Sequence, residues 1–225
     1  IVMKQKDRLT KRIYDKFQNA DGTFGDRTQT SFAFALMLNL GSSDRLVQCL
    51  LKQIDSDGGI FTTGIFGTPL LYSVLHRYRH DDIVYHWLTQ DSKIGFRNML
   101  SNGNGVLSEL FTGKYFSANH AMFSSYIQWY YQALGGIEVR KNENNCSELI
   151  IQPFFANGIN AVESHLKTEI GIIRTKWIRE KGVVIFEAVI PKGVEYRYLG
   201  PSGHEEQISV DNKEEGRIKA VYSSV

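Results

Sequence analysis

The sequence predicts a two-part protein in which a helical array or toroid is followed by an antiparallel β-sandwich. Up to about residue 135, apolar side chains recur at helical spacing, whereas after Gly136 they alternate with polar ones. The helical segments are joined by glycine- and aromatic-containing loops at intervals of very roughly 20–25 residues, a spacing typical of helical hairpins. The later segments are short runs separated by turn residues, which is the pattern of a sandwich.

The composition is that of a globular chain with a sizeable core. Of its 225 residues, 42% are hydrophobic and 22% are charged. A formal net charge of only +2 argues against a nucleic-acid or anionic-membrane surface. No apolar run approaches the roughly 20 residues that span a bilayer. Aromatic residues make up 12% of the chain, and they serve sugar binding as well as core packing.

The opening residues predict a helix that lacks a start signal. Leu9, Ile13 and Phe17 lie four apart and therefore share one helical face. Neither a capping residue nor an initiator methionine nor a signal-peptide pattern precedes them. We therefore expect the chain to be a fragment of a longer protein.

Five further helices follow from spacing and end signals. The segment 29–40 is apolar nearly all round, which predicts a buried helix. Ser43 is expected to be the N-cap of the next helix, and Thr68 is expected to cap a helix whose first residue is Pro69. The last two helices are expected at 82–90 and at 118–134, the latter ended by two glycines.

The second half predicts strands, and we place the domain boundary after residue 136. The two domains are then 1–136 and 137–225. Turn signals stand at 182, 192–193, 201–203 and 211–212. Trp177, Tyr196 and Tyr198 are expected to pack at the contact between the two domains rather than bind sugar, since aromatic residues on strands usually fill cores. The predicted strands are 137–141, 148–152, 159–166, 169–178, 182–190, 194–199 and 217–224.

The long connection 93–120 is the densest candidate for a functional site. It holds one carboxylate flanked by apolar side chains, Glu109, and a partly desolvated carboxylate suits acid–base chemistry. The alternative is a solvated surface group. His120 stands at the entrance of the last helix, where it could contact a ligand or simply cap and pack.

Other motifs exclude several classes of site. His76, His80 and His86 have spacings that fit no metal site, and they are expected to be surface or supporting groups. The segment 61–69 has Phe66 beside glycines, which would let a sugar ring stack on the phenyl face, and it lacks the ending of a phosphate-binding loop. There is no GxSxG or HExxH motif. We therefore expect neither a metal nor another cofactor.

Three stretches taken together resemble one enzyme family. They are FTTGIFGTPLLYSVL at 61–75, NGNGVLSE at 102–109 and SANHAMFSSYIQWYYQALGGI at 117–137. They resemble the bacterial α-L-rhamnosidases of glycoside hydrolase family 78. The resemblance implies the later helices of an (α/α)6 barrel over 1–136 and a C-terminal β-sandwich over 137–225.

The resemblance also implies roles for single residues. The family ends a Gly-Ala-Thr-Thr-x-Trp-Glu motif in a catalytic carboxylate, which corresponds here to Glu109 as general base, and Ser108 stands where the family has tryptophan. The family's sugar-contacting histidine corresponds to His120. Beside it, Asn119, Phe66 and Phe111 are expected to contact the substrate.

The function implied is that of an inverting glycoside hydrolase that removes terminal L-rhamnose or a similar sugar. One carboxyl group of such an enzyme protonates the leaving oxygen and the other activates a water. We find no counterpart of the family's general acid, so the chain alone is expected to be incomplete and inactive. Its partners would be a carbohydrate and the upstream part of the enzyme or an oligomer mate. The compartment stays open between periplasm, exterior and cytoplasm of a bacterium.

Two alternatives belong to other functional classes. A non-hydrolytic carbohydrate-binding module would keep the cleft without the chemistry, and Ser108 in place of tryptophan favours it. A purely structural piece would complete or oligomerise a larger enzyme.

Overall fold

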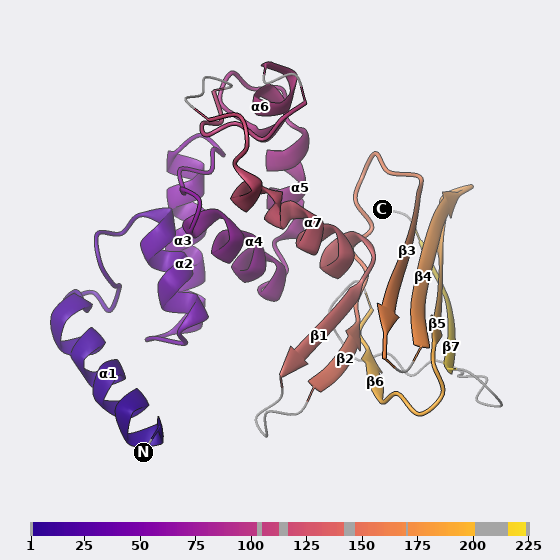
Figure 1. Cartoon of the computed structure of the whole chain (residues 1–225), viewed down its shortest axis with the longest axis horizontal. Helices are drawn as coiled ribbons and strands as arrows, with labels where there is room; N and C mark the ends of the chain where they lie inside the picture. The colour runs from indigo at the N-terminus through magenta and orange to yellow at the C-terminus, as the bar shows by residue number, and fades with distance from the viewer. Residues whose placement is uncertain are drawn as a thin grey trace. The chain divides into compact units, whose positions relative to one another are not determined.

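The computed structural model (Figure 1) describes residues 2–102, 105–112, 117–141, 147–169, 171–200 and 216–223. The chain divides into two compact units, Ile1–Tyr126 and Ile127–Val225. The first is helical, and the second holds the last helical turns and the strands. The domain boundary expected after residue 136 stays a prediction, and the turns expected at 201–203 and 211–212 lie outside the described residues.

The helical prediction for the first half is confirmed. A short helix, α6, lies within the stretch that the sequence analysis treats as one long loop. The helices are α1 Val2–Phe17, α2 Gln29–Met37, α3 Ser43–Ser56, α4 Gly67–Arg77, α5 Asp81–Thr89 and α6 Phe96–Asn102, followed by the 3₁₀ helix η1 Ala121–Ser125.

Three expected helix starts are wrong by one or two residues. Helix α5 begins at Asp81 rather than at 82. The N-cap of α3 is Ser42, and Ser43 is already helical. Helix α4 begins at Gly67 rather than at Pro69. The Thr68 hydroxyl donates to the carbonyl oxygen of Gly64 at 2.9 Å, so it satisfies the preceding turn instead of capping the next one.

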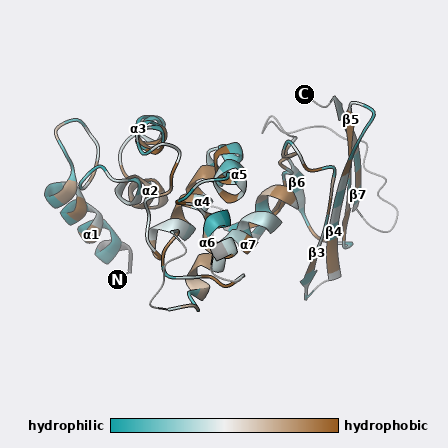
Figure 2. Ribbon diagram, turned by 90° about the horizontal axis from the view of Figure 1, so that it is seen from above, coloured by the Kyte–Doolittle hydropathy of each residue, from teal (hydrophilic) through white to brown (hydrophobic). Residues whose placement is uncertain are grey.

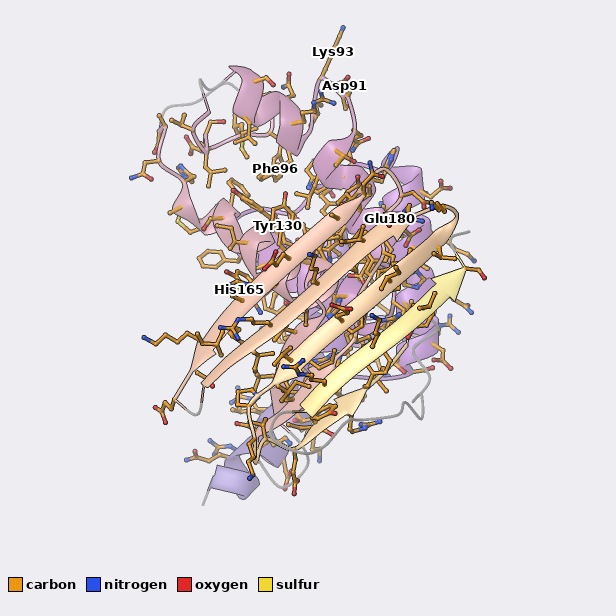
Figure 3. The ribbon with its side chains drawn as sticks, turned by 90° about the vertical axis from the view of Figure 1, so that its right-hand side faces the viewer. Asp91, Lys93, Phe96, Tyr130, His165 and Glu180 are labelled. Carbon is orange, nitrogen blue, oxygen red and sulfur yellow. The ribbon has the colours of Figure 1, made fainter. Side chains whose placement is uncertain are left out.

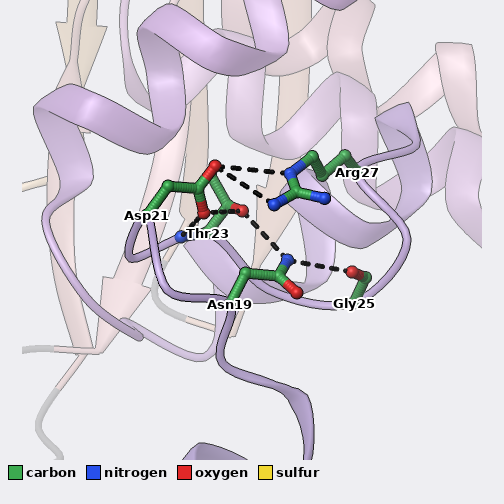
Figure 4. A network of polar contacts seen from close by, with 5 residues as sticks. All are labelled: Asn19, Asp21, Thr23, Gly25 and Arg27. Atoms are coloured by element: carbon green, nitrogen blue, oxygen red, sulfur yellow. Dashed lines mark hydrogen bonds and ion pairs between the residues drawn. The ribbon is translucent and has the colours of Figure 1, made fainter.

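A polar network fixes the loop between α1 and α2 (Figure 4). One Asp21 carboxylate oxygen accepts hydrogen bonds from the Thr23 backbone N–H at 3.1 Å and the Thr23 hydroxyl at 2.6 Å. The other oxygen accepts two bonds of 3.3 Å from the Arg27 guanidinium. The bonds from Thr23, assisted by the charge of Arg27, lower the pKa of Asp21 to about 2. Asn19 completes the loop by donating to the Gly25 carbonyl at 3.0 Å.

The core of the helical unit lies where α2 packs against α3 and α4. Gly67 permits a close approach there, because a Cβ at this position would lie 2.7 Å from the Thr30 hydroxyl oxygen. His76 and Asp81 are also in this interior, 2% and 3% exposed, with 2.9 Å between Nδ1 and Oδ1. Of the two expectations for His76, a surface or a supporting group, its burial excludes the surface position. His76 is a buried, paired side chain.

Apolar side chains of α1 and α2 remain exposed. Leu9 and Phe17 of α1 are 54% and 47% exposed, and Phe34 of α2 is 44% exposed. The prediction that α2 is buried all round is thus wrong for one face. A groove of about 740 Å³ lies here, and its lining includes Phe17 and Phe34. Figure 2 shows that hydrophobic and hydrophilic residues alternate along the ribbon of α1, as an amphipathic helix requires.

The final helix changes its hydrogen-bonding pattern along its length. It begins at Ala121 rather than at 118, and after η1 it continues as α7 Tyr126–Trp129 and then as the π-helical turn η2 Tyr130–Leu134. The N–H of Gly135 donates to the Tyr130 carbonyl at 2.8 Å, the five-residue step of a π turn. Gly136 ends the helix with a φ of 67°, as the two glycines predict.

The second half consists of strands in two sheets, one with the order β1-β2-β6 and one with the order β3-β4-β5-β7. All described pairings are antiparallel except that of β2 with β6, so the expectation of a purely antiparallel sandwich is wrong for this pair. The chain reaches β6 from β5 of the other sheet, and such a crossover allows a parallel pairing. The strands are β1 Ile137–Lys141, β2 Ser147–Ile151, β3 Ala161–Thr168, β4 Gly171–Glu180, β5 Val183–Ile190, β6 Tyr196–Tyr198 and β7 Gly216–Ser223.

The two sheets share one hydrophobic core. Trp177 and Phe186 are fully buried there, and the Phe186 ring stacks on Tyr198 of the other sheet at 5.7 Å and 18°. Burial also raises the pKa of Tyr196. Trp177 and Tyr198 thus pack in the core shared by the two sheets, and the expected position at the domain contact stays a prediction.

The opposite face of the four-stranded sheet carries charges in register. Glu163 of β3 pairs with Lys176 of β4, Lys176 pairs with Glu187 of β5, and Glu187 pairs with Lys219 of β7. The Lys219 ammonium lies 3.1 Å from the Glu187 carboxylate. Alternating signs across neighbouring strands are favourable and identify this face as solvated.

Candidate functional site

Backbone pairing brings the segment of Glu109 beside the segment of His120. The N–H of His120 donates to the Leu107 carbonyl at 2.8 Å, and the N–H of Glu109 donates to the Ser117 carbonyl at 3.2 Å. The two bonds run in opposite directions between 107–109 and 117–120. Two candidates that are eleven positions apart in the sequence therefore lie on adjacent, paired stretches of chain.

The Glu109 carboxylate is half-buried. Among the described residues it has neither a hydrogen-bond donor nor an ion-pair partner. A carboxylate in that position has its lone pairs available for a water or a sugar hydroxyl.

The imidazole of His120 likewise has a nitrogen without a hydrogen bond. His120 is the N-cap of η1 but makes no side-chain capping bond. Its Nδ1 is buried and has no hydrogen-bond partner within the described ranges. Because a buried polar atom normally has a partner, this nitrogen indicates a place for a ligand or water.

A series of packed aromatic rings connects the loop of Glu109 with the helical core. Phe111 contacts Trp87 edge-on at 4.9 Å and Phe123 at 4.8 Å, and Trp87 stacks on Phe61 at 4.9 Å and 15°. The Phe123 ring lies 6.3 Å from that of His120. Phe111 thus anchors the loop of Glu109 to the helical core. Trp87, which the sequence analysis does not single out, is a fully buried side chain within α5 and carries no local sign of this role.

Ser108 stands next to Glu109 and is completely buried. Its hydroxyl donates to the Leu110 carbonyl at 3.1 Å and so closes the turn that contains Glu109. A side chain in this position supports the backbone and does not line an open pocket.

The other two candidates lie at the surface. Phe66 is 77% exposed at the N-cap of α4 and makes no ring contact within the described part of the chain. Asn119 is exposed, and its N–H donates to the Ser117 hydroxyl at 3.4 Å. Asn119 is the neighbour of His120 in the chain. Among the described residues, no contact joins Phe66 to Glu109.

A metal centre is not formed by the part of the chain that the structure describes. No group of three His, Cys, Asp or Glu side chains gathers in the described ranges. In the same ranges no helix combines the length and the apolar character that crossing a membrane requires.

Curated proteins similar to this chain are α-L-rhamnosidases. One from Formosa agariphila is 24% identical over 219 residues, which cover 92% of this chain and 23% of the relative. One from Streptomyces avermitilis is 22% identical over 218 residues, covering 89% of this chain and 21% of the relative. The chain thus spans about a quarter or less of the length of these relatives.

Solved structures share the fold. The Streptomyces avermitilis α-L-rhamnosidase complexed with L-rhamnose superposes with a TM-score of 0.77 at 19% identity, covering 97% of this chain and 23% of that one. The α-L-rhamnosidase from Dictyoglumus thermophilum gives 0.73 at 21% identity, covering 97% and 27%.

A family model matches more than half of the chain. It describes the bacterial alpha-L-rhamnosidase 6 hairpin glycosidase domain and matches residues 3–134. This match includes both Glu109 and His120. The chain therefore belongs to the bacterial α-L-rhamnosidase family, glycoside hydrolase family 78.

Proposed function

We propose that this chain is the C-terminal part of an inverting glycoside hydrolase that removes terminal L-rhamnose or a similar sugar. Residues 1–136 would form the later helices of an (α/α)6 toroid, completed by upstream chain or an oligomer mate. Glu109 would act as the general base. His120, Asn119, Phe66 and Phe111 would contact the sugar.

The pairing of 107–109 with 117–120 is the observation that carries the proposal. It brings the segments of Glu109 and His120 side by side, and neither the Glu109 carboxylate nor the His120 Nδ1 is hydrogen-bonded to a described side chain. A base and a hydroxyl-binding group on neighbouring segments would suit a sugar whose ring must be oriented against a water.

The chemistry then requires a second carboxyl group. In inverting glycosidases the two carboxyl groups stand about 6.5–9.5 Å apart, which leaves room for the attacking water. Glu109 would take a proton from that water, while a general acid outside this chain protonates the leaving oxygen. The chain alone is therefore expected to bind sugar without efficient turnover.

A second candidate function is carbohydrate binding without hydrolysis. Ser108 favours it, because the family has tryptophan at this position and Ser108 is a small, buried side chain. A site without that aromatic ring could keep its polar contacts with a sugar and lose the chemistry.

The experiment titrates the 225-residue chain with L-rhamnose and follows the backbone amides of residues 107–112 and 117–120 by NMR. We expect saturable shifts, little change in affinity for Glu109→Gln, and weaker binding for His120→Ala. Glu187→Gln is the matched control, since it neutralises an exposed carboxylate on β5.

An aryl α-L-rhamnoside tests the chemical role. The chain alone should show no turnover above the buffer rate. In an enzyme that carries this segment with its general acid, Glu109→Gln should reduce the rate by about 10²–10⁴-fold with affinity retained. Near-full turnover by that variant would refute the role of Glu109, and an absence of any rhamnose-induced shift would refute the sugar site.

A further inference from the structure

A second groove, independent of the proposed function, lies within the unit Ile127–Val225. Its volume is about 540 Å³, and one side is formed by Tyr130, Tyr131 and Leu134 of the π turn. The other side is residues 162–165 of β3. Figure 3 labels Tyr130 and His165, which approach this groove from the helix and from the sheet. Ligand pockets commonly have volumes of about 300–1,000 Å³, so a mono- or disaccharide would fit.

The wall formed by the π turn is fixed to the sheet by buried hydrogen bonds. The Trp177 indole N–H donates to the Leu134 carbonyl at 2.8 Å, and the Thr175 hydroxyl donates to the Gly135 carbonyl at 2.6 Å. Gly135 also approaches β3 so closely that a Cβ would lie 2.5 Å from the Ser164 hydroxyl oxygen. The groove therefore exists before a ligand arrives, which lowers the entropy lost on binding.

The aromatic side presents two tyrosine rings to solvent. Tyr130 and Tyr131 are 40% and 41% exposed, although they stand in the last turn of a helix that packs on a sheet. Tyr131 has no hydrogen-bond partner among the described residues. A tyrosine ring combines a flat apolar face, which suits the C–H face of a pyranose, with a hydroxyl that can bond to the ligand.

The opposite side presents a carboxylate and an imidazole. The His165 Nε2 lies 3.0 Å from a Glu163 carboxylate oxygen, and both side chains are more than half exposed. The second carboxylate oxygen and the imidazole Nδ1 remain available to ligand hydroxyls. β3 is also an edge strand of the described sheet. Alternate backbone N–H and C=O groups along it therefore have no partner strand.

These features select the ligand class. A lone carboxylate already paired with an imidazole is a poor cation site, and the same carboxylate repels a phosphate. Stacking rings on one side and hydroxyl-bonding groups on the other are complementary to an uncharged, hydroxyl-rich ring. We propose that the groove between Tyr130–Tyr131 and Glu163–His165 binds a neutral carbohydrate.

The test is a binding experiment on the 225-residue chain by saturation-transfer NMR and calorimetry. The probes are cellobiose, maltose, xylobiose and methyl α-L-rhamnoside. At least one should bind, and Tyr131→Ala and Glu163→Gln should each weaken that binding about tenfold. Tyr131→Phe, which keeps the stacking ring, should retain most of the affinity.

Matched controls separate the groove from its surroundings. Ile127→Ala removes an exposed apolar side chain from the same helix, and Glu187→Gln removes a carboxylate from the same face of the sheet. Both should bind as the unaltered chain does. Because Tyr131 is well exposed, Tyr131→Ala should fold, and a near-UV spectrum identical to that of the unaltered chain verifies this.

Two results would overturn the proposal. One is an absence of binding by all four probes. The other is binding that survives Tyr131→Ala and Glu163→Gln but disappears with His120→Ala. That second result would place the sugar at the proposed rhamnose site and would leave the proposed function intact. An absence of binding at the groove, in turn, would not contradict the proposed role of Glu109 as general base.

Discussion

The backbone N–H of His120 donates a hydrogen bond of 2.8 Å to the carbonyl oxygen of Leu107. Together with the bond from Glu109 to Ser117, it makes a short two-stranded pairing out of segments that the sequence presents as loop. The amides of His120 and Glu109 should therefore exchange with solvent more slowly than that of exposed Ala118. Amide hydrogen exchange by NMR measures this, and equal rates at all three positions would contradict the pairing.

Ser108 should tolerate a small side chain but not a large one. Ser108→Ala removes one hydrogen bond to Leu110 and should reduce the free energy of unfolding by about 1 kcal/mol. Ser108→Trp forces an indole into a completely buried position and should reduce it by about 1–3 kcal/mol. Denaturant unfolding measures both, with exposed Ser101→Trp as the control. A neutral Ser108→Trp would show that a cavity for the ring already exists.

The buried pair of His76 and Asp81 should matter far more than an exposed carboxylate beside it. Asp81→Ala leaves the buried imidazole without this carboxylate and should reduce the free energy of unfolding by about 3 kcal/mol. Asp82→Ala changes the next residue of the same first helical turn, where the side chain is exposed, and should have a small effect. Equal effects of the two substitutions would show that the helix terminus, not the buried pair, is responsible.

Asp21 should make the stability of the helical unit depend on acid pH. Its pKa is about 2 in the folded chain, against 3.8 for an ordinary aspartate, so the ionised carboxylate favours the folded state. That stabilisation is present above pH 3.8 and is lost as the pH falls through about 2. Asp21→Asn should therefore lower the melting temperature at pH 6 and converge with the unaltered chain near pH 2. Asp15→Asn, on exposed α1, should show no such pH dependence.

The bond from Thr175 to Gly135 should stabilise the end of the π turn. Thr175→Val keeps the shape of the side chain and removes its hydroxyl, leaving a buried carbonyl without this donor. We expect a loss of about 1–3 kcal/mol in unfolding free energy. Thr175→Ser restores the donor and should recover part of the loss. Equal stability of the valine and serine variants would mean that the hydroxyl is not needed.

The larger features of the fold could be predicted from the sequence because they rest on periodicity. Alternating burial over Gly171–Glu180 follows directly from alternating apolar residues. Helix starts were less predictable, since Ser42 and Ser43 are equally good capping residues and only tertiary packing selects between them. The parallel pairing of β2 with β6 depends on where a distant segment returns, and no local pattern encodes that.

The candidate site was predictable only as a set of residue types. The roles of Glu109 and His120 rest on the family resemblance and stay predictions, and the backbone pairing that brings their segments together has no signature in the sequence. For His76, the sequence indicates what the residue does not do but not where it lies. Its spacing from other histidines excludes a metal, yet its burial against Asp81 depends on the start of α5, which the pattern places one residue too late.

The π turn Tyr130–Leu134 has a consequence for how this segment tolerates changes of length. A π turn contains one residue more than an α turn, and each helical residue rotates the chain by about 100°. Deleting a single residue here would let the turn relax to α geometry and would rotate one tyrosine out of its present direction. The two adjacent tyrosines are thus kept in phase by an extra residue, so the spacing between Trp129 and Gly135 should be far less permissive than that of the surrounding loops.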